Sequence, residues 1–262
     1  MPERRHCRAL YLAATVSAMS ALAATHAVAG PPFATDDPQP TDYKHFEIYL
    51  YSEGTRAAGD TTGTLPGLEV NYGAAPNLQI SVAIPLAYDK GENHGARVSY
   101  GATEIGLKYR FVEEDENGWR PQVSFYPSAE IPIGDSDRST GIGGGHTRFF
   151  LPLWSQKSFG PWTTFGGGGY WINPGKGDKN YWFMGWAVQR QITPCFSLGV
   201  EAFHQSRDSV GGEDSTGMNV GGVYDLSERW HLVGSVGTGI QNRKTTNQFS
   251  YYAAIEWTPS AD

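Results

Sequence analysis

Charged side chains recur at every second residue within otherwise apolar stretches, and this spacing is the feature of the chain that could do chemistry. In residues 104–111, Glu104, Lys108 and Arg110 share one face, and aliphatic and aromatic residues occupy the other. Successive side chains of a β-strand point to opposite faces, so this alternation puts the charges on one side of a sheet. Such a side could line a passage for solutes, and its candidate lining residues are Glu47, Tyr49, Glu69, Glu104, Lys108, Arg110, Tyr126, Glu130, Arg148 and Glu201.

Histidines are the residues that could support hydrolysis. A hydrolase needs a serine nucleophile hydrogen-bonded to a histidine that a third polar group orients. His146, His204 and His231 are available, but no serine accompanies them in a recognisable arrangement, and the sequence has no G-x-S-x-G motif. We therefore expect no catalytic residues and no enzymatic activity.

Metal and phosphate sites are not predicted either. His6 and His26 lie in an N-terminal leader, and the other five histidines do not pair at metal-ligand spacing. The glycine-rich stretch 141–145 is not followed by the Lys-Ser/Thr of a phosphate-binding loop. The acidic stretch 208–214 is interpreted as a solvated loop, with a calcium or lipopolysaccharide bridge as the alternative. The sequence predicts no metal and no cofactor.

Composition narrows the class of protein. The 262 residues include 33 glycines and 13% aromatic residues, which is too much large apolar surface for a disordered chain. The formal net charge is -7, and no cluster of lysine and arginine is present. Nucleic-acid affinity depends on such a cluster, so no nucleic-acid partner is expected.

The first 29 residues have the pattern of a secretory signal peptide. Arg4, Arg5 and Arg8 precede an apolar stretch over 9–24, and Ala27-Val28-Ala29 forms a small-x-small cleavage site. The apolar stretch is diluted by serine and threonine and is short for a spanning helix. We expect an exported chain whose one remaining cysteine, Cys195, cannot form an intrachain disulfide.

Strand-like alternation organises the rest of the chain. No stretch has a convincing helical stripe, and none approaches 18 consecutive apolar residues. Twelve segments alternate with period two instead. They are 46–51, 68–73, 78–87, 104–111, 122–133, 148–154, 162–172, 182–192, 196–203, 218–226, 230–240 and 249–257.

The connections between these segments alternate in length. Long polar connections follow the odd-numbered strands, at 52–62, 89–99, 135–145, 173–180, 206–215 and 241–247, and mostly tight turns lie between them. An up-and-down antiparallel sheet puts all odd-numbered connections at one end. Short periplasmic turns and longer external loops are typical of an outer-membrane barrel.

A soluble β-sandwich or a periplasmic barrel could show the same alternation, but three features favour a membrane barrel. Most strands run roughly 8 to 12 residues, near the ~9 to 11 of a membrane-spanning strand. Aromatic residues gather at both strand ends, as in interfacial girdles. Nearly all charges lie opposite the aliphatic face; the exception is Arg190, which is placed to reach the headgroups.

The sequence therefore predicts an all-β protein, a transmembrane antiparallel up-and-down β-barrel of about 12 strands. We divide it into a signal peptide over 1–29, a Pro-rich periplasmic segment over 30–44, the barrel over 45–258 and a tail over 259–262. The Pro-rich segment either hangs in the periplasm or enters the lumen, and it is too short for a folded plug domain.

The start of the mature chain carries a family resemblance. The stretch Pro31–Pro40, P-P-F-A-T-D-D-P-Q-P, followed by His45-Phe46-Glu47, resembles the opening of an outer-membrane family named for the meta-pathway of phenol degradation. Residues 66–73 and 101–109 are similar to its second and fourth strands. The resemblance implies an outer-membrane transporter, and the pathway name does not specify a substrate.

These observations predict a channel in the outer membrane of a Gram-negative envelope. Small solutes, whether aromatic, neutral or cationic, would diffuse through its narrow polar lumen. Cationic or neutral solutes are favoured because carboxylates outnumber bases on the inner face. The alternative is a closed structural or adhesion barrel that displays its outer loops. The expected partners are outer-membrane lipids and lipopolysaccharide, the barrel-assembly machinery and a small-molecule solute.

Overall fold

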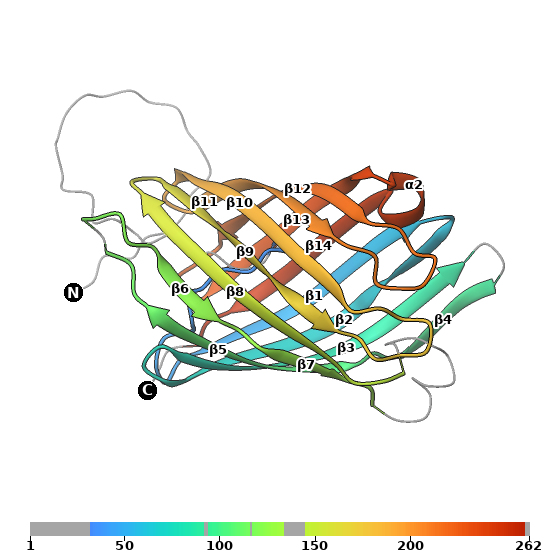
Figure 1. Ribbon diagram of the computed structural model, residues 1–262. Coiled ribbons are helices and arrows are strands. Elements are labelled where there is room, and N and C mark those ends of the chain that lie inside the picture. The colour runs from blue at the N-terminus through green and yellow to red at the C-terminus, as the bar shows by residue number, and fades with distance from the viewer. Residues whose placement is uncertain (1–31, 92–93, 116, 134–144, 260–262) are drawn as a thin grey trace, which may run out of the picture.

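A computed structural model of the chain describes residues 32–91, 94–115, 117–133 and 145–259. Within these residues nearly all regular structure is β-strand, arranged as a tilted barrel (Figure 1). The predicted signal peptide and most of the 135–145 connection lie outside the described residues. The strands are β1 (Phe46–Ala57), β2 (Asp60–Ala75), β3 (Leu78–Gly91), β4 (His94–Tyr100), β5 (Thr103–Val112), β6 (Gln122–Phe125), β7 (Ser128–Ile131), β8 (Arg148–Phe159), β9 (Trp162–Ile172), β10 (Tyr181–Thr193), β11 (Phe196–Gln205), β12 (Ser215–Asp225), β13 (Trp230–Gln241) and β14 (Phe249–Trp257).

The sheet closes on itself through antiparallel pairs. The first strand, β1, pairs with both β2 and the last strand, β14. β4 pairs with residues 86–91 of β3, and β5 pairs with residues 78–83 of the same strand. β4 and β5 therefore form one interrupted spanning strand. In the same way β6 and β7 both lie between β5 and β8. The fold is therefore a closed barrel of twelve spanning strands, which confirms the predicted fold class.

The strand predicted over 122–133 is split in the structure. The break falls at Tyr126-Pro127, and proline has no N–H to donate to a neighbouring strand. The carbonyl of Pro127 still accepts from the Leu107 N–H at 3.0 Å. The barrel wall is therefore continuous through the break.

Two of the connections predicted to be long are mostly strand. The segment 52–62 turns only at Ala58 and Gly59, both with positive φ (51° and 91°), and β1 and β2 pair up to this turn. Residues 89–91 and 94–99 likewise extend β3 and β4. The period-two pattern fades here because both faces of a strand become polar beyond the membrane.

The outer face of the barrel is apolar. Leu50, Leu153 and Val220 are each about half exposed, as are most aliphatic residues that share this face. Aromatic residues pair near the short-turn end, with ring centroids 4.6 Å apart for Phe46 and Tyr72. The outward Arg190 lies over the Trp162 ring at 5.1 Å, near the same end. This surface fits a bilayer with aromatic girdles at its interfaces.

Helix contributes little to the fold. A single turn, α2 (Arg243–Thr246), lies in the connection between β13 and β14. Among the described residues, no helix has the length and hydrophobicity to cross a membrane.

Candidate transport lumen

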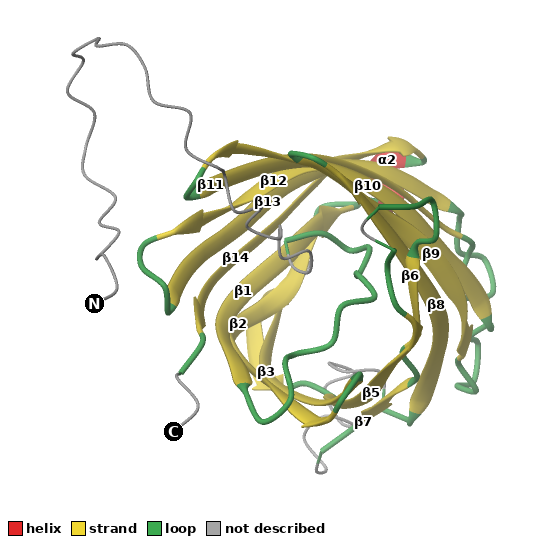
Figure 2. Ribbon diagram, turned by 90° about the vertical axis from the view of Figure 1, so that its left-hand side faces the viewer, coloured by secondary structure: helices red, strands yellow, loops and turns green. Residues whose placement is uncertain are grey.

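Residues 32–45, here called the N-terminal segment, lie inside the barrel. Figure 2 looks along the barrel and shows this segment within the ring of strands. The segment bridges to the end of β2 through Tyr43 and Gly73, and its other end reaches β13, where the Ser235 hydroxyl donates to the Pro32 carbonyl at 2.5 Å. Of the two positions considered from the sequence, hanging in the periplasm or entering the lumen, the described residues occupy the second.

Glu201 of β11 holds the segment at mid-barrel. Its carboxylate is buried and accepts hydrogen bonds from the backbone N–H groups of Ala34 (3.2 Å) and Thr35 (2.5 Å). The side chain of Asn219 also donates to it, at 2.5 Å. A buried carboxylate with several donors is well satisfied, and removing it would leave buried N–H groups without partners. Next to this contact the Phe33 ring packs on Phe165, with centroids 6.2 Å apart.

The opposite wall holds the segment through cations and amides. The buried Lys108 ammonium forms a salt bridge with Asp36 at 3.1 Å. Arg110 donates to the side chain of Gln39 at 2.6 Å, and the N–H of Thr41 donates to Gln79 at 2.7 Å.

Asp37 is the most deeply buried carboxyl of the segment. Burial raises the pKa of Asp37 to about 8, although the nearby Lys108 charge acts in the opposite direction. Asp36 and Glu47 lie close enough to raise this pKa further. The buried environment therefore favours a protonated Asp37 at neutral pH.

The outer half of the lumen carries a row of carboxylates that we call the acidic arc: Glu53, Glu69, Glu104 and Glu130. Glu104 interacts electrostatically with Glu69 and Glu130, and Glu53 with Glu130, so the four form one negative region. Arg148 pairs with Glu130 at 2.5 Å. Among the described residues, the other three members form no salt bridge.

The neighbouring strands β8 to β11 carry an aromatic arc, defined as Phe150, Trp171, Phe183 and Phe203. The rings of Phe150 and Trp171 stack with centroids 4.7 Å apart, and Phe183 lies 6.2 Å from both Phe150 and Phe203. Gly217 makes room for this row, because a Cβ at that position would lie 2.5 Å from the Phe203 ring. All four rings are half-buried and border the lumen.

The structure places the ten predicted lining residues on the inner face, but not in one environment. Tyr49, Lys108 and Glu201 are buried within the wall or against the N-terminal segment. The other seven are half-buried: Glu47, Glu69, Glu104, Arg110, Tyr126, Glu130 and Arg148. Their part in transport or selectivity remains a prediction.

Sequence reasoning missed several inner residues. Glu53 was assigned to a loop, although it continues the alternation of Glu47, Tyr49 and Tyr51 on β1. Glu256 faces inward on β14, and its cross-strand neighbour is His231 of β13. Three of the four aromatic-arc rings were also missed, because glycine interrupts their strands and weakens the period-two pattern.

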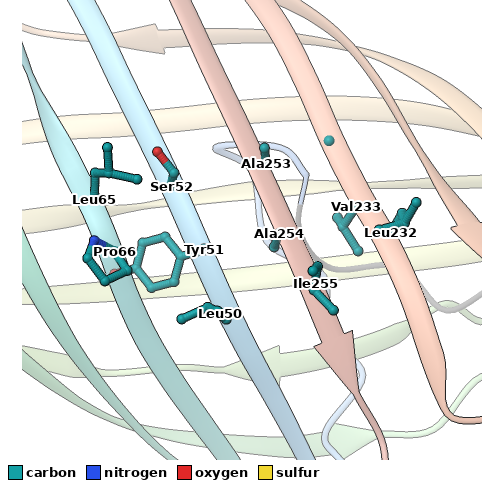
Figure 3. A pocket seen from close by; sticks show the side chains of 11 residues that line it. Leu50, Tyr51, Ser52, Leu65, Pro66, Leu232, Val233, Ala253, Ala254 and Ile255 are labelled. Carbon is teal, nitrogen blue, oxygen red and sulfur yellow. The ribbon is translucent and has the colours of Figure 1, made fainter.

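A depression of about 510 Å³ lies on the barrel wall, lined by residues of β1, β2, β13 and β14. Figure 3 shows Leu50, Ser52 and Ala253 among the residues that line it, on β1 and β14. These side chains belong to the outward face of their strands, where small residues leave the apolar surface hollow.

The three histidines considered for hydrolysis have partners other than serine. His146 contacts Asn173 at 3.0 Å, and His204 contacts Thr216 at 2.8 Å. His231 contacts Asp225 at 2.7 Å near a short turn. In the part of the chain that the structure describes, no three His, Cys, Asp or Glu side chains are grouped to hold a metal ion.

A closed twelve-stranded barrel with an apolar outer belt and a charged interior defines an outer-membrane β-barrel protein. A family model described as "Putative MetA-pathway of phenol degradation" matches residues 36–255, and the chain belongs to this family. No curated protein matches the chain.

Solved structures share the fold. An outer-membrane channel from Pseudomonas putida F1 has a TM-score of 0.67 at 13% identity, over 85% of this chain and 98% of that one. The NanC porin has a TM-score of 0.55 at 9% identity, over 80% and 98% of the two chains. The KdgM porin in complex with disordered oligogalacturonate has a TM-score of 0.54 at 11% identity, over 82% and 99%.

Proposed function

We propose that the protein is an outer-membrane channel through which small solutes diffuse. The observation that carries this proposal is the polar outer half of the lumen, where Glu53 is exposed to solvent inside a wall whose outer face is apolar. A structural barrel has no need for charge in this position. The likeness of the fold to an outer-membrane channel and to porins supports the proposal.

The passage is narrow. Twelve strands enclose more space than the ~8 that side chains alone can fill, and less than the 16 to 18 of an open porin. The N-terminal segment takes up part of this space in the periplasmic half, from Thr41 near the short turns to Pro32 at mid-barrel. Only small solutes would pass beside it.

The acidic arc gives the channel a preference for cations and for neutral polar solutes. Carboxylates within low-dielectric walls focus a negative potential and raise the local concentration of cations. Arg148 pairs with Glu130, and Lys108, which pairs with Asp36, also interacts electrostatically with Glu69.

Single-channel recording in a planar bilayer tests the proposal. The refolded mature protein is expected to give discrete conductance steps with cation preference, and the Glu69→Gln/Glu104→Gln variant is expected to lose much of that preference. This pair of substitutions leaves the Arg148–Glu130 salt bridge intact. The matched control is Glu113→Gln/Glu228→Gln, which removes two exposed carboxylates at the short-turn end.

A closed barrel that displays its outer loops is the second candidate. The inner salt bridge between Lys108 and Asp36 braces the wall and favours it. Absence of conductance from protein shown to be folded would support this candidate and would contradict the channel.

We also propose that the barrel catalyses no reaction, binds lipopolysaccharide around its outer rim and is inserted by the barrel-assembly machinery. The last strand, β14, ends at the aromatic Trp257. Residues follow Trp257 in the sequence, so the machinery would have to recognise β14 at an internal position of the chain. Replacing Trp257 by alanine should lower the amount of assembled barrel, which is measured as the heat-modifiable fraction in outer-membrane preparations.

A further inference from the structure

The acidic arc and the aromatic arc meet between β7 and β8. Glu130 of β7 lies opposite Arg148 of β8. Two residues away on the same face, Ser128 lies opposite Phe150. Carboxylates and ring faces are therefore neighbours at this junction.

The side chain of Arg148 shows that this junction can hold a flat cation. The Arg148 guanidinium lies 4.9 Å from the centre of the Trp171 ring and donates to Glu130 at 2.5 Å. A flat cation here gains from the ring face and from the carboxylate together. Glu104 lies directly across from Glu130 on β5 and forms no salt bridge among the described residues.

Neighbouring rings extend the apolar part of the junction. Phe150 stacks on Trp171, and Phe183 meets Phe150 edge to face at 6.2 Å. These rings are half-buried, so part of each faces the lumen. A solute could lay an apolar ring against them while its charged end stays near Glu104.

We propose that this junction is a binding site for small organic cations that carry a flat aromatic body, such as aromatic amidines and amines. The inference rests on the proposed channel function and names the class of solute that its outer half takes up. The aromatic arc contacts the ring of the solute, Glu104 and Glu130 take its charge, and Arg148 competes for the same two surfaces.

Calorimetric titration of the refolded full mature chain in nonionic detergent tests the site with three probes. Benzamidine has a ring and a positive charge, benzyl alcohol has a ring alone, and benzoate has a ring and a negative charge. Benzamidine is expected to bind more tightly than the other two. Equal binding of benzamidine and benzoate would overturn the proposal, and this comparison needs no variant to fold.

Two variants should move the affinity in opposite directions. Glu104→Gln is expected to weaken benzamidine binding about tenfold, the scale of one ion pair in a partly buried site. Arg148→Gln removes the competing guanidinium and is expected to tighten it, whereas a merely structural role for Arg148 would give weaker binding. The control is Glu228→Gln, which lies on an exposed turn. Unchanged affinity in both variants would overturn the site.

Conductance of the same preparations separates this inference from the channel proposal. Conductance without selective benzamidine binding would refute the site and leave the channel standing. Selective benzamidine binding without conductance would support the site and refute the channel.

Discussion

The two halves of the lumen use charge in different ways. In the periplasmic half, Lys108 and Glu201 are buried and each has a partner on the N-terminal segment. In the outer half, Glu53 is exposed and the carboxylates outnumber the one arginine beside them. The first half resembles a protein interior, where buried charges are paired. The second resembles a vestibule.

This difference assigns separate tasks to residues that look alike in sequence. Glu201 and Glu104 are both glutamates on the inner face of a strand. Glu201 holds the N-terminal segment, and Glu104 faces the outer half of the lumen. Substitutions in the periplasmic half should therefore change how far the lumen is open, and substitutions in the outer half should change which solutes enter.

Removing the N-terminal segment should have the largest effect. A barrel refolded without residues 32–40 loses the chain that crosses its periplasmic half, and we expect its single-channel conductance to rise severalfold. The control is the full mature chain refolded in parallel. Unchanged conductance would show that the segment does not limit the passage.

Substituting Glu201 by alanine should release the segment without deleting it. The change leaves the buried N–H group of Thr35 without its acceptor, at a cost of about 1–3 kcal/mol, or roughly 5- to 150-fold in the docking equilibrium, and it also removes the acceptor of the Ala34 N–H group. A Thr35→Cys reporter in a Cys195→Ser background should then react faster with a thiol reagent by a similar factor.

The matched control for this experiment is Glu228→Ala, which removes an exposed carboxylate. A labelling rate that stays the same in both variants would mean that Glu201 does not hold the segment.

Raising the pH should loosen the segment moderately. Burial raises the pKa of docked Asp37 to about 8, whereas a free aspartate ionises near pH ~4. Between pH ~4 and about 8, docking keeps Asp37 protonated, whereas a free aspartate would be ionised. The docked state is therefore most stable below pH ~4 and loses stability as the pH rises toward about 8.

We expect labelling of the Thr35→Cys reporter, relative to a Glu53→Cys reporter, to rise across this range. The Asp37→Asn variant should abolish most of the rise. A rise of the same size in that variant would assign the effect to other groups, such as Glu47.

The smallest effect is expected for Glu53→Gln in the outer half. This carboxylate is exposed, and salt screens its charge, so we expect a slight fall in cation preference measured as a reversal potential. Labelling of the Thr35→Cys reporter should not change. Faster labelling would contradict the separation of the two halves.

Much of this architecture could be predicted from the sequence, because the residues of a barrel strand alternate between its inner and outer faces. The twelve strands and the inward direction of Glu69 and Glu104 follow from period two alone. Glu53 was missed because the alternation fades where β1 leaves the membrane. Trp171 of the aromatic arc was missed because Gly166–Gly169, which precede it on β9, carry no side chains that would reveal a face.

The position of the N-terminal segment could not be predicted in the same way. Its prolines indicate an extended chain, but neither its backbone groups nor its side chains, such as Asp36 and Gln39, indicate which strands they will contact. Its main anchors, Glu201 and Lys108, lie far along the chain and come together only when the barrel closes. Nothing local in residues 32–45 specifies these partners.

Thiol accessibility can be compared directly between the two halves of the lumen. Thr35→Cys and Glu53→Cys variants, each in a Cys195→Ser background, are exposed to a membrane-impermeant thiol reagent from the outer side. We predict fast reaction at position 53 and slow reaction at position 35. Equal rates at the two positions would contradict a lumen that is open in its outer half and narrowed by its own N-terminal segment.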